Sequence, residues 1–127
     1  MTPLPYAQRL LEQVRSSSDI NATDKNGVTL LHRAVRFRNP EAVRAALKKG
    51  AAVNQTCKRS GSTPLHRAVT YTGAPGTAGK NSERLSIIEI LLKAGADPSI
   101  RNKQGKTALD YARDSEARAF MQKKTRK

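Results

Sequence analysis

The sequence predicts an all-α solenoid, in which helix-turn-helix repeats follow one another and are joined by short β-like turns. The first observation is internal repetition: Gly-Val-Thr-Leu-Leu-His-Arg-Ala-Val at 27–35 returns as Gly-Ser-Thr-Pro-Leu-His-Arg-Ala-Val at 61–69 and as Gly-Lys-Thr-Ala-Leu-Asp-Tyr-Ala at 105–112. A second signature, Leu-Lys-Lys-Gly-Ala-Ala-Val-Asn at 47–54, recurs as Leu-Leu-Lys-Ala-Gly-Ala-Asp-Pro at 91–98. Aromatic residues make up only 4% of the chain, so the core must consist of small aliphatic side chains, which suit close helix packing. Repetition on this scale indicates stacked supersecondary units.

Each copy of the first signature carries the signals for a turn followed by a helix. Its opening glycine allows the positive φ of a tight turn, and the threonine two residues later can cap a helix with its hydroxyl. Leu31, Ala34 and Val35 then place apolar groups at i, i+3 and i+4, on one helical face. The second helices show the same spacing, at Val43, Ala46 and Leu47 and at Ile87, Ile88, Leu91 and Leu92. Gly50 and Gly95 are expected to end them.

The order Asp-x-x-Gly-x-Thr-x-Leu-His-x-Ala, followed by Leu-Leu-Lys-x-Gly-Ala-Asp, is similar to the ankyrin repeat, whose period is about 33 residues. The similarity runs from Asp19 to about Ala112. It implies about three repeats plus an N-terminal capping helix, in a single domain over 1–127. We expect an N-terminal cap at 1–23, repeat 1 at 24–57, repeat 2 at 58–101 with an insertion at 72–82, and a truncated C-terminal capping repeat at 102–127.

Three departures from regular repetition are visible. The first copy is one residue longer than the period, with Cys57 or a neighbour as the extra position, and the second carries about eleven extra residues, best placed at 72–82 between its two helices. The third has Asp110 in place of histidine, and its second helix is expected at 115–124 with Ala117, Phe120 and Met121 facing inward. A helix at about 5–16, with Leu10, Leu11 and Val14 apolar, would cap the other end.

The chain is strongly basic, with 24 Lys and Arg against 10 Asp and Glu and a formal charge of +14. Such an excess attracts acidic proteins or nucleic acid. Cys57 is the only cysteine, so a reducing compartment is expected, and no apolar run approaches the length needed to cross a bilayer. We therefore expect a cytoplasmic monomer without membrane insertion.

Few residues are candidates for chemistry. His32 and His66 occupy the same place in successive copies, where the resemblance implies a hydrogen bond to the turn through the nearby threonine; neither has the neighbours that a metal site or a catalytic triad needs. Cys57 is an ordinary loop cysteine or a thiol activated by Lys58 and Arg59. The glycine-rich insertion fails the phosphate-binding P-loop pattern, although its backbone could hold a single anion. We expect no catalytic residue, metal or cofactor, and no enzymatic activity.

The resemblance implies that partners bind the concave face, formed by the turn tips and the exposed side of the first helices. Phe37 and Tyr71 take equivalent positions there and would act as apolar anchors among basic residues. The expected partner-binding residues are Lys25, Arg36, Phe37, Arg59, Tyr71, Arg101, Lys103 and Lys106. The predicted function is non-catalytic binding of an acidic protein segment. The alternative is binding to the phosphate backbone of nucleic acid, driven by the net charge.

Overall fold

A computed structural model of the chain describes residues 6–70, 81–112 and 115–125. This part of the chain is helical and contains no strand, which confirms the predicted all-α class. Its helices are α1 (Tyr6–Ser16), α2 (Leu30–Arg36), α3 (Pro40–Lys48), α4 (Pro64–Val69), α5 (Asn81–Lys93), α6 (Ala108–Tyr111) and α7 (Ser115–Thr125).

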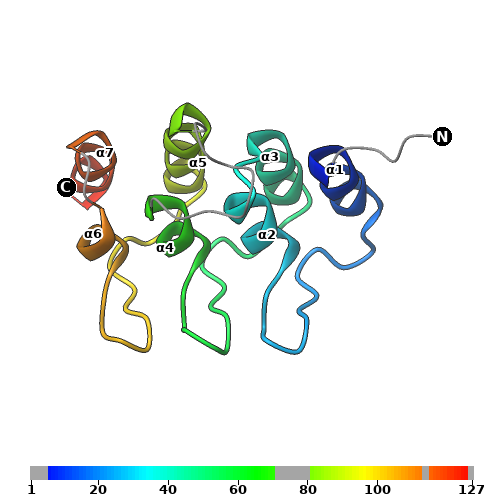
Figure 1. The fold of residues 1–127 in the computed structure, drawn as a ribbon, viewed down its shortest axis with the longest axis horizontal. Coiled ribbons are helices and arrows are strands. Elements are labelled where there is room, and N and C mark those ends of the chain that lie inside the picture. Colours follow the sequence, from blue (N-terminus) through cyan, green and yellow to red (C-terminus); the bar gives the residue numbers. More distant parts are fainter. Residues whose placement is uncertain (1–5, 71–80, 113–114, 126–127) are drawn as a thin grey trace.

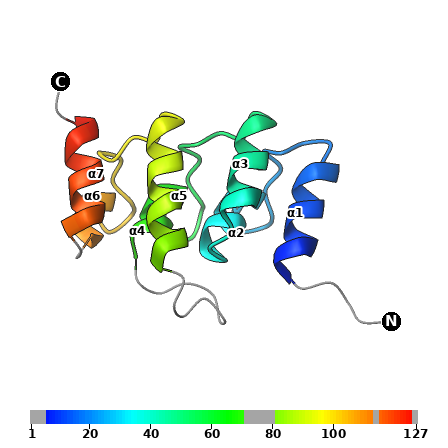
Figure 2. The same cartoon turned by 90° about the horizontal axis from the view of Figure 1, so that it is seen from above.

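The helices stack in two layers that run along the long axis of the molecule (Figures 1 and 2). One layer holds the first helices of the repeats, α2, α4 and α6, and the other holds α1, α3, α5 and α7; within each layer neighbouring helices are in contact. Three hydrogen-bonded turns project beside the first helices (Figure 1), and we call them finger 1 (24–28), finger 2 (57–62) and finger 3 (102–106). The predicted solenoid, with α1 at one end and α7 at the other, is confirmed.

The core is a continuous band of aliphatic side chains between the two layers. The residues predicted to face inward do so with three exceptions, Leu11, Leu47 and Phe120, which are only partly buried. The fully buried side chains of largest volume include Leu10, Leu31, Leu65, Ile87, Ile88, Leu91 and Met121. Because none of these is aromatic, adjacent helices approach closely over alanines such as Ala34 and Ala68, both 0% exposed.

On the finger side, a histidine joins each repeat to the next. In α2, Thr29 caps the helix: its Oγ1 accepts from the backbone N–H of His32 at 3.3 Å and lies 2.9 Å from His32 Nδ1. The other ring nitrogen, Nε2, lies 3.2 Å from the carbonyl oxygen of Ser62 in finger 2. Since a carbonyl only accepts, Nε2 carries the proton. His66 repeats the arrangement with the Lys106 carbonyl at 2.9 Å.

On the opposite side, an asparagine amide joins the loops of successive repeats. Asn21 donates from Nδ2 to the Gly50 carbonyl at 3.3 Å and accepts at Oδ1 from the Ala52 N–H at 2.7 Å. Asn54 makes the same pair of bonds one repeat later, to the Gly95 carbonyl at 3.3 Å and from the Asp97 N–H at 2.8 Å. Repeats 1 and 2 are thus fixed to each other on both sides, while the asparagine link alone joins the cap to repeat 1 and the histidine link joins repeat 2 to repeat 3.

Finger 1 packs so closely against finger 2 that its turn requires glycine. Gly27 has φ +75°, and a Cβ there would lie 2.9 Å from the backbone nitrogen of Lys58 in the next finger. That nitrogen donates to the Asn26 carbonyl at 2.8 Å, so it cannot retreat without breaking a bond between fingers. Positive φ and this contact together exclude other residues.

Two buried arginines close the C-terminal end of α4, where the insertion begins. Arg38 is 4% exposed and donates to three carbonyls: Val35 and Arg67 at 3.2 Å and Thr70 at 2.7 Å. Arg84, 3% exposed, donates to the Val69 carbonyl at 3.0 Å. Carbonyls at a helix C-terminus carry partial negative charge, which favours cations. Burial, with a smaller contribution from the charge of Arg84, lowers the pKa of Arg38 to about 10, so it stays charged at neutral pH.

The helix boundaries differ slightly from those predicted. Helix α5 begins at Asn81, so Asn81 and Ser82, expected in the insertion, are helical. Asn and Ser are favoured at the first positions of helices because their side chains can bond to the backbone there. Residues 71–80 lie outside the described residues, and α7 extends one residue beyond the predicted end, to Thr125.

Replacing Arg38 by methionine should lower the free energy of unfolding by about 3 kcal/mol, because several buried carbonyls would lose their donor. Urea unfolding followed by circular dichroism measures the change. Arg36→Met is the matched control: Arg36 is exposed and two residues away, and its loss should cost less than about 0.5 kcal/mol. Equal effects of the two substitutions would contradict the role given to Arg38.

Candidate functional site

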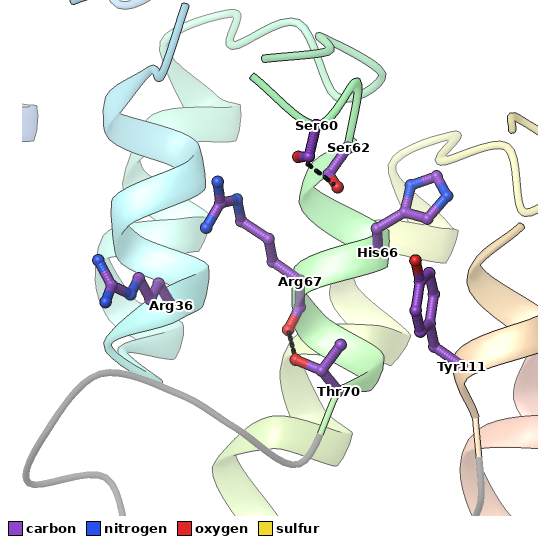
Figure 3. A pocket seen from close by; sticks show the side chains of 7 residues that line it. All are labelled: Arg36, Ser60, Ser62, His66, Arg67, Thr70 and Tyr111. Carbon is purple, nitrogen blue, oxygen red and sulfur yellow. Dashed lines mark hydrogen bonds between the residues drawn. The ribbon is translucent and has the colours of Figure 1, made fainter. Parts of the chain in front are cut away.

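Two open grooves adjoin on the side of the first helices and fingers. The first, about 510 Å³, lies between repeats 1 and 2, and the second, about 420 Å³, lies between repeats 2 and 3 (Figure 3). Arg36 and Arg67 line both, so the two grooves form one depression, which we call the arginine groove. Its other lining residues are Asp24, Asn26, Val28, His32, Arg33, Phe37, Cys57, Arg59, Ser60, Ser62, His66, Thr70 and Tyr111.

The charges of the arginine groove are strongly unequal. Four arginines line it, against one carboxylate, that of Asp24. Asp24 is already engaged: one oxygen accepts from the backbone N–H groups of Asn26 and Val28 at 2.8 and 3.0 Å, and the other pairs with Arg33 at 3.3 Å. These bonds, the backbone ones foremost, lower the pKa of Asp24 below its ordinary value. The groove therefore keeps a net positive charge.

Three arginines of the groove have no carboxylate partner among the described residues. They are Arg36, Arg59 and Arg67. Arg36 ends α2, Arg59 sits in finger 2, and Arg67 lies in α4; Figure 3 shows the Arg67 side chain reaching toward α2, where Arg36 lies. Three guanidinium groups from three elements thus meet at one surface, and guanidinium is the side-chain group best suited to bind carboxylate or phosphate.

Finger 2 differs from its neighbours in the residue that organises its turn. In fingers 1 and 3, an oxygen of Asp24 or Asn102 accepts from two backbone N–H groups of the turn. Cys57 takes this position in finger 2: its N–H donates to the Ser62 carbonyl at 3.0 Å, as that of Asp24 does to Val28 at 3.1 Å. The bond spans one residue more than in finger 1, so the extra residue of the first copy lies in the turn after Cys57.

The sulfur of Cys57 also takes over the electrostatic role of the carboxylate. It lies 3.2 Å from Ser60 Oγ and 3.8 Å from the Arg67 Nη2 donor, just as Asp24 pairs with Arg33. Burial raises the pKa of the thiol, but hydrogen bonds from Ser60, Ser62 and Arg67 outweigh it and lower the pKa to about 6. Cys57 is only 2% exposed. Because it is buried, the sulfur serves the turn of finger 2 and does not face solvent.

The structure brings together only part of the predicted binding set. Arg36, Phe37 and Arg59 line the arginine groove. Phe37 also packs partly against the core. Tyr71, predicted to stack above Phe37, lies outside the described residues. The remaining members, Lys25, Arg101, Lys103 and Lys106, are exposed but line neither half of the groove.

Two of these remaining residues bond with their side chains to backbone carbonyls of the fingers. Lys103 Nζ donates to the carbonyl of Lys58, and its backbone N–H donates to the Ser60 carbonyl at 2.9 Å, which ties finger 3 to finger 2. Arg101 Nη1 donates to the Gly105 carbonyl at 2.8 Å, within the base of finger 3. Their charges still face solvent beside the groove.

Sequence reasoning missed three lining residues that share one position of the repeat. Arg33, Arg67 and Tyr111 each follow the residue that pairs with the capping threonine. For Arg33 the spacing in the sequence indicated a place beside Arg36, because residues at i and i+3 must share a helical face. Tyr111 closes the repeat 3 end of the groove, with its ring edge-on to that of His66 at 6.1 Å between centroids (Figure 3).

Other kinds of site are not visible in the described part of the chain. No group of three His, Cys, Asp or Glu side chains is placed to hold a metal ion among residues 6–70, 81–112 and 115–125. Within the same ranges, no helix has the length and apolar character needed to cross a membrane.

The Cys57 thiol should ionise near pH 6 in the folded protein, as judged by the ultraviolet absorbance of the thiolate. Its pKa is lower in the folded chain than its ordinary value of 9.0, so the contribution of the thiolate to stability is complete above about pH 9 and is lost as the pH falls through about 6. Cys57→Ser, which cannot ionise in this range, should show no absorbance change. A native thiol that titrates near pH 9 would show that finger 2 does not hold a thiolate.

Comparisons with known proteins agree with this architecture. A family model described as ankyrin repeats (3 copies) matches residues 4–99. The crystal structure of the ankyrin repeat domain of Bcl-3 superposes with a TM-score of 0.69 and 32% sequence identity, covering 91% of this chain and 44% of that chain.

Similar curated proteins are much longer than this chain. Rabankyrin-5 of Mus musculus is 35% identical over 96 residues, 76% of this chain and 8% of that protein. The E3 ubiquitin-protein ligase Ufd4 of Drosophila melanogaster is 38% identical over 109 residues, 85% and 4% respectively. Palmitoyltransferase Hip14 of the same organism is 37% identical over 97 residues, 76% and 14%. The chain thus spans only 4 to 14% of the length of these relatives.

The segment matched by the family model contains helices α1 to α5 and fingers 1 and 2. Repeats of this kind generally serve as protein–protein interaction modules that are typically not catalytic. The family model, the similar structure and the repeated threonine–histidine caps all lead to one assignment. The chain belongs to the ankyrin-repeat family.

Proposed function

We propose that this chain is a non-catalytic protein-binding module that holds an acidic segment of a partner protein in the arginine groove. The observation that carries the proposal is the set of three arginines, Arg36, Arg59 and Arg67, which face the groove without a carboxylate partner among the described residues. Positive charge gathered in a depression favours an acidic partner over a neutral one.

The electrostatics of the groove suit recognition of an extended segment. The groove crosses repeats 1 to 3, so a bound segment would meet charged donors at several points along its length. The formal charge of +14 adds long-range attraction that raises the rate of encounter. Exposed basic residues on the fingers, Lys25, Lys103, Lys106 and Arg101, would extend the contact beyond the groove.

Apolar contacts would supply the part of the affinity that salt does not screen. Phe37 lies in the repeat 1 half of the groove and Tyr111 in the repeat 3 half. Aromatic and arginine side chains are the residues that most often dominate binding energy at protein interfaces. Tyr71 would add a further anchor.

We further propose that the chain acts as a cytoplasmic monomer, because a chain with a single cysteine is suited to a reducing compartment.

Charge reversal in the groove should weaken binding of an acidic probe, here a fluorescent oligo-glutamate peptide measured by anisotropy. We expect Arg36→Glu with Arg59→Glu to weaken it about tenfold or more. Both side chains are exposed, so the melting temperature should stay within a few degrees. Arg44→Glu with Lys48→Glu on α3 changes the net charge equally, and both of these are also exposed. This control pair should change affinity about twofold at most.

Two results would contradict the proposal. If the α3 pair weakens binding more than the groove pair, the binding surface lies elsewhere. If both pairs weaken binding equally and steeply with salt, while an oligothymidylate of the same charge binds more tightly than the peptide, counterion release from nucleic acid is the better account.

A further inference from the structure

Where the two halves of the groove meet, arginine side chains carry hydrogen-bond donors that no described acceptor uses. Arg67 carries five N–H donors, yet its side chain bonds only to the Cys57 sulfur, at 3.8 Å, among the described residues. Its Nε is buried and has no hydrogen-bond partner there. Arg36 has no side-chain hydrogen bond or ion pair with any described residue. We call Arg36, Arg67, Ser60 and Ser62 the junction.

A serine hydroxyl lies in the same half of the groove as the two guanidinium groups. The Ser60 and Ser62 hydroxyl oxygens lie 2.8 Å apart. Because a hydroxyl proton rotates to suit its partners, Ser62 can donate its proton to a bound ligand. Both serines line the same half of the groove as Arg36 and Arg67 (Figure 3). The Cys57 sulfur, which accepts from Arg67, is 2% exposed and lines only the other half. The junction therefore offers two cations and a hydroxyl to a ligand that enters from solvent.

The number and type of these donors distinguish between possible anions. A carboxylate has two oxygens and one charge, and a single guanidinium satisfies it in a bidentate pair. A phosphomonoester has three acceptor oxygens and a charge near −2 at neutral pH, which matches two guanidinium groups and a hydroxyl. The half-groove of about 420 Å³ has room for a phosphorylated side chain together with adjoining backbone.

We infer that the junction of Arg36, Arg67 and Ser62 binds the phosphate of a phosphorylated serine or threonine in the partner segment. This inference rests on the proposed function, since it places a phosphorylated residue within the acidic segment. Binding would then depend on phosphorylation of the partner, because a neutral hydroxyl side chain would leave both guanidinium groups without an anion. Arg59, in the repeat 1 half of the groove, would remain for an ordinary acidic residue nearby.

The test uses the full chain and three short peptides of identical alanine–glycine sequence that carry a central phosphoserine, glutamate or serine. Binding is followed by NMR through the arginine Nε–Hε and backbone signals at constant ionic strength. We expect the phosphoserine peptide to bind about tenfold or more tightly than the glutamate peptide, with shifts centred on Arg36, Ser62 and Arg67. The serine peptide should leave these signals unchanged.

Substitutions distinguish binding at the junction from binding caused by the general positive charge of the chain. Arg36→Met and Arg67→Met should each weaken phosphopeptide binding about tenfold, and Arg67→Lys should restore little, because lysine lacks the planar fork of donors. Arg44→Met on α3 is the matched control and should have no effect. Circular dichroism checks that each variant is folded; Arg36 is exposed, so its variant tests the inference even if Arg67→Met does not fold.

The other possible results distinguish failure of this inference from failure of the proposed function. Equal affinity for the phosphoserine and glutamate peptides at the junction would overturn the inference and leave the proposed function standing. Phosphopeptide binding that is insensitive to Arg36→Met would also overturn it. If neither anionic peptide shifts the groove signals, the inference and the proposed function fail together.

Discussion

The structure depends on a histidine that joins each repeat to the next. His32 accepts from the capping threonine at Nδ1 and donates from Nε2 to the Ser62 carbonyl of finger 2; His66 does the same toward Lys106 in finger 3. Burial, the largest effect, lowers the pKa of His32 to about 4, so the ring stays neutral at physiological pH. A protonated ring could not accept at Nδ1, and the bond that organises the cap would be lost.

This link also builds the binding surface. Because His32 holds the Ser62 carbonyl, finger 2 is fixed against α2, and the finger brings Arg59 and the Ser60–Ser62 pair beside Arg36. Arg67 enters from α4, whose C-terminal end is fixed by Arg38 from the preceding repeat. The arginines of the groove therefore come from different repeats, and their spacing follows from the register of the stack rather than from any single helix. Preorganisation of this kind lowers the entropic cost of binding.

The sequence allowed the repeats, the helices and most inward-facing residues to be predicted, because those features follow from local periodicity. The residues of the groove were harder to predict, since lining it depends on contacts between repeats. Arg67 was missed because its side chain reaches across to the preceding repeat. The contact between Lys103 Nζ and a carbonyl of the neighbouring finger is likewise a contact between repeats that residue types do not indicate. That Cys57 occupies the position of Asp24 could not be predicted from residue types, since a thiol resembles a carboxylate only when the turn and Arg67 stabilise its anion.

The most direct test of this account is the tautomer of the two histidines in the folded protein together with the protonation state of His32, measured from imidazole ¹⁵N chemical shifts as a function of pH. The account predicts the Nε2–H tautomer for both His32 and His66, with His32 remaining neutral until the pH falls to about 4. It also predicts that protonation of His32 accompanies loss of the folded signals, because a lowered pKa means that acid favours the unfolded chain. An Nδ1–H tautomer, or a His32 ring that becomes protonated near pH 6.5 while the chain stays folded, would contradict the claim that these histidines hold the repeats in register.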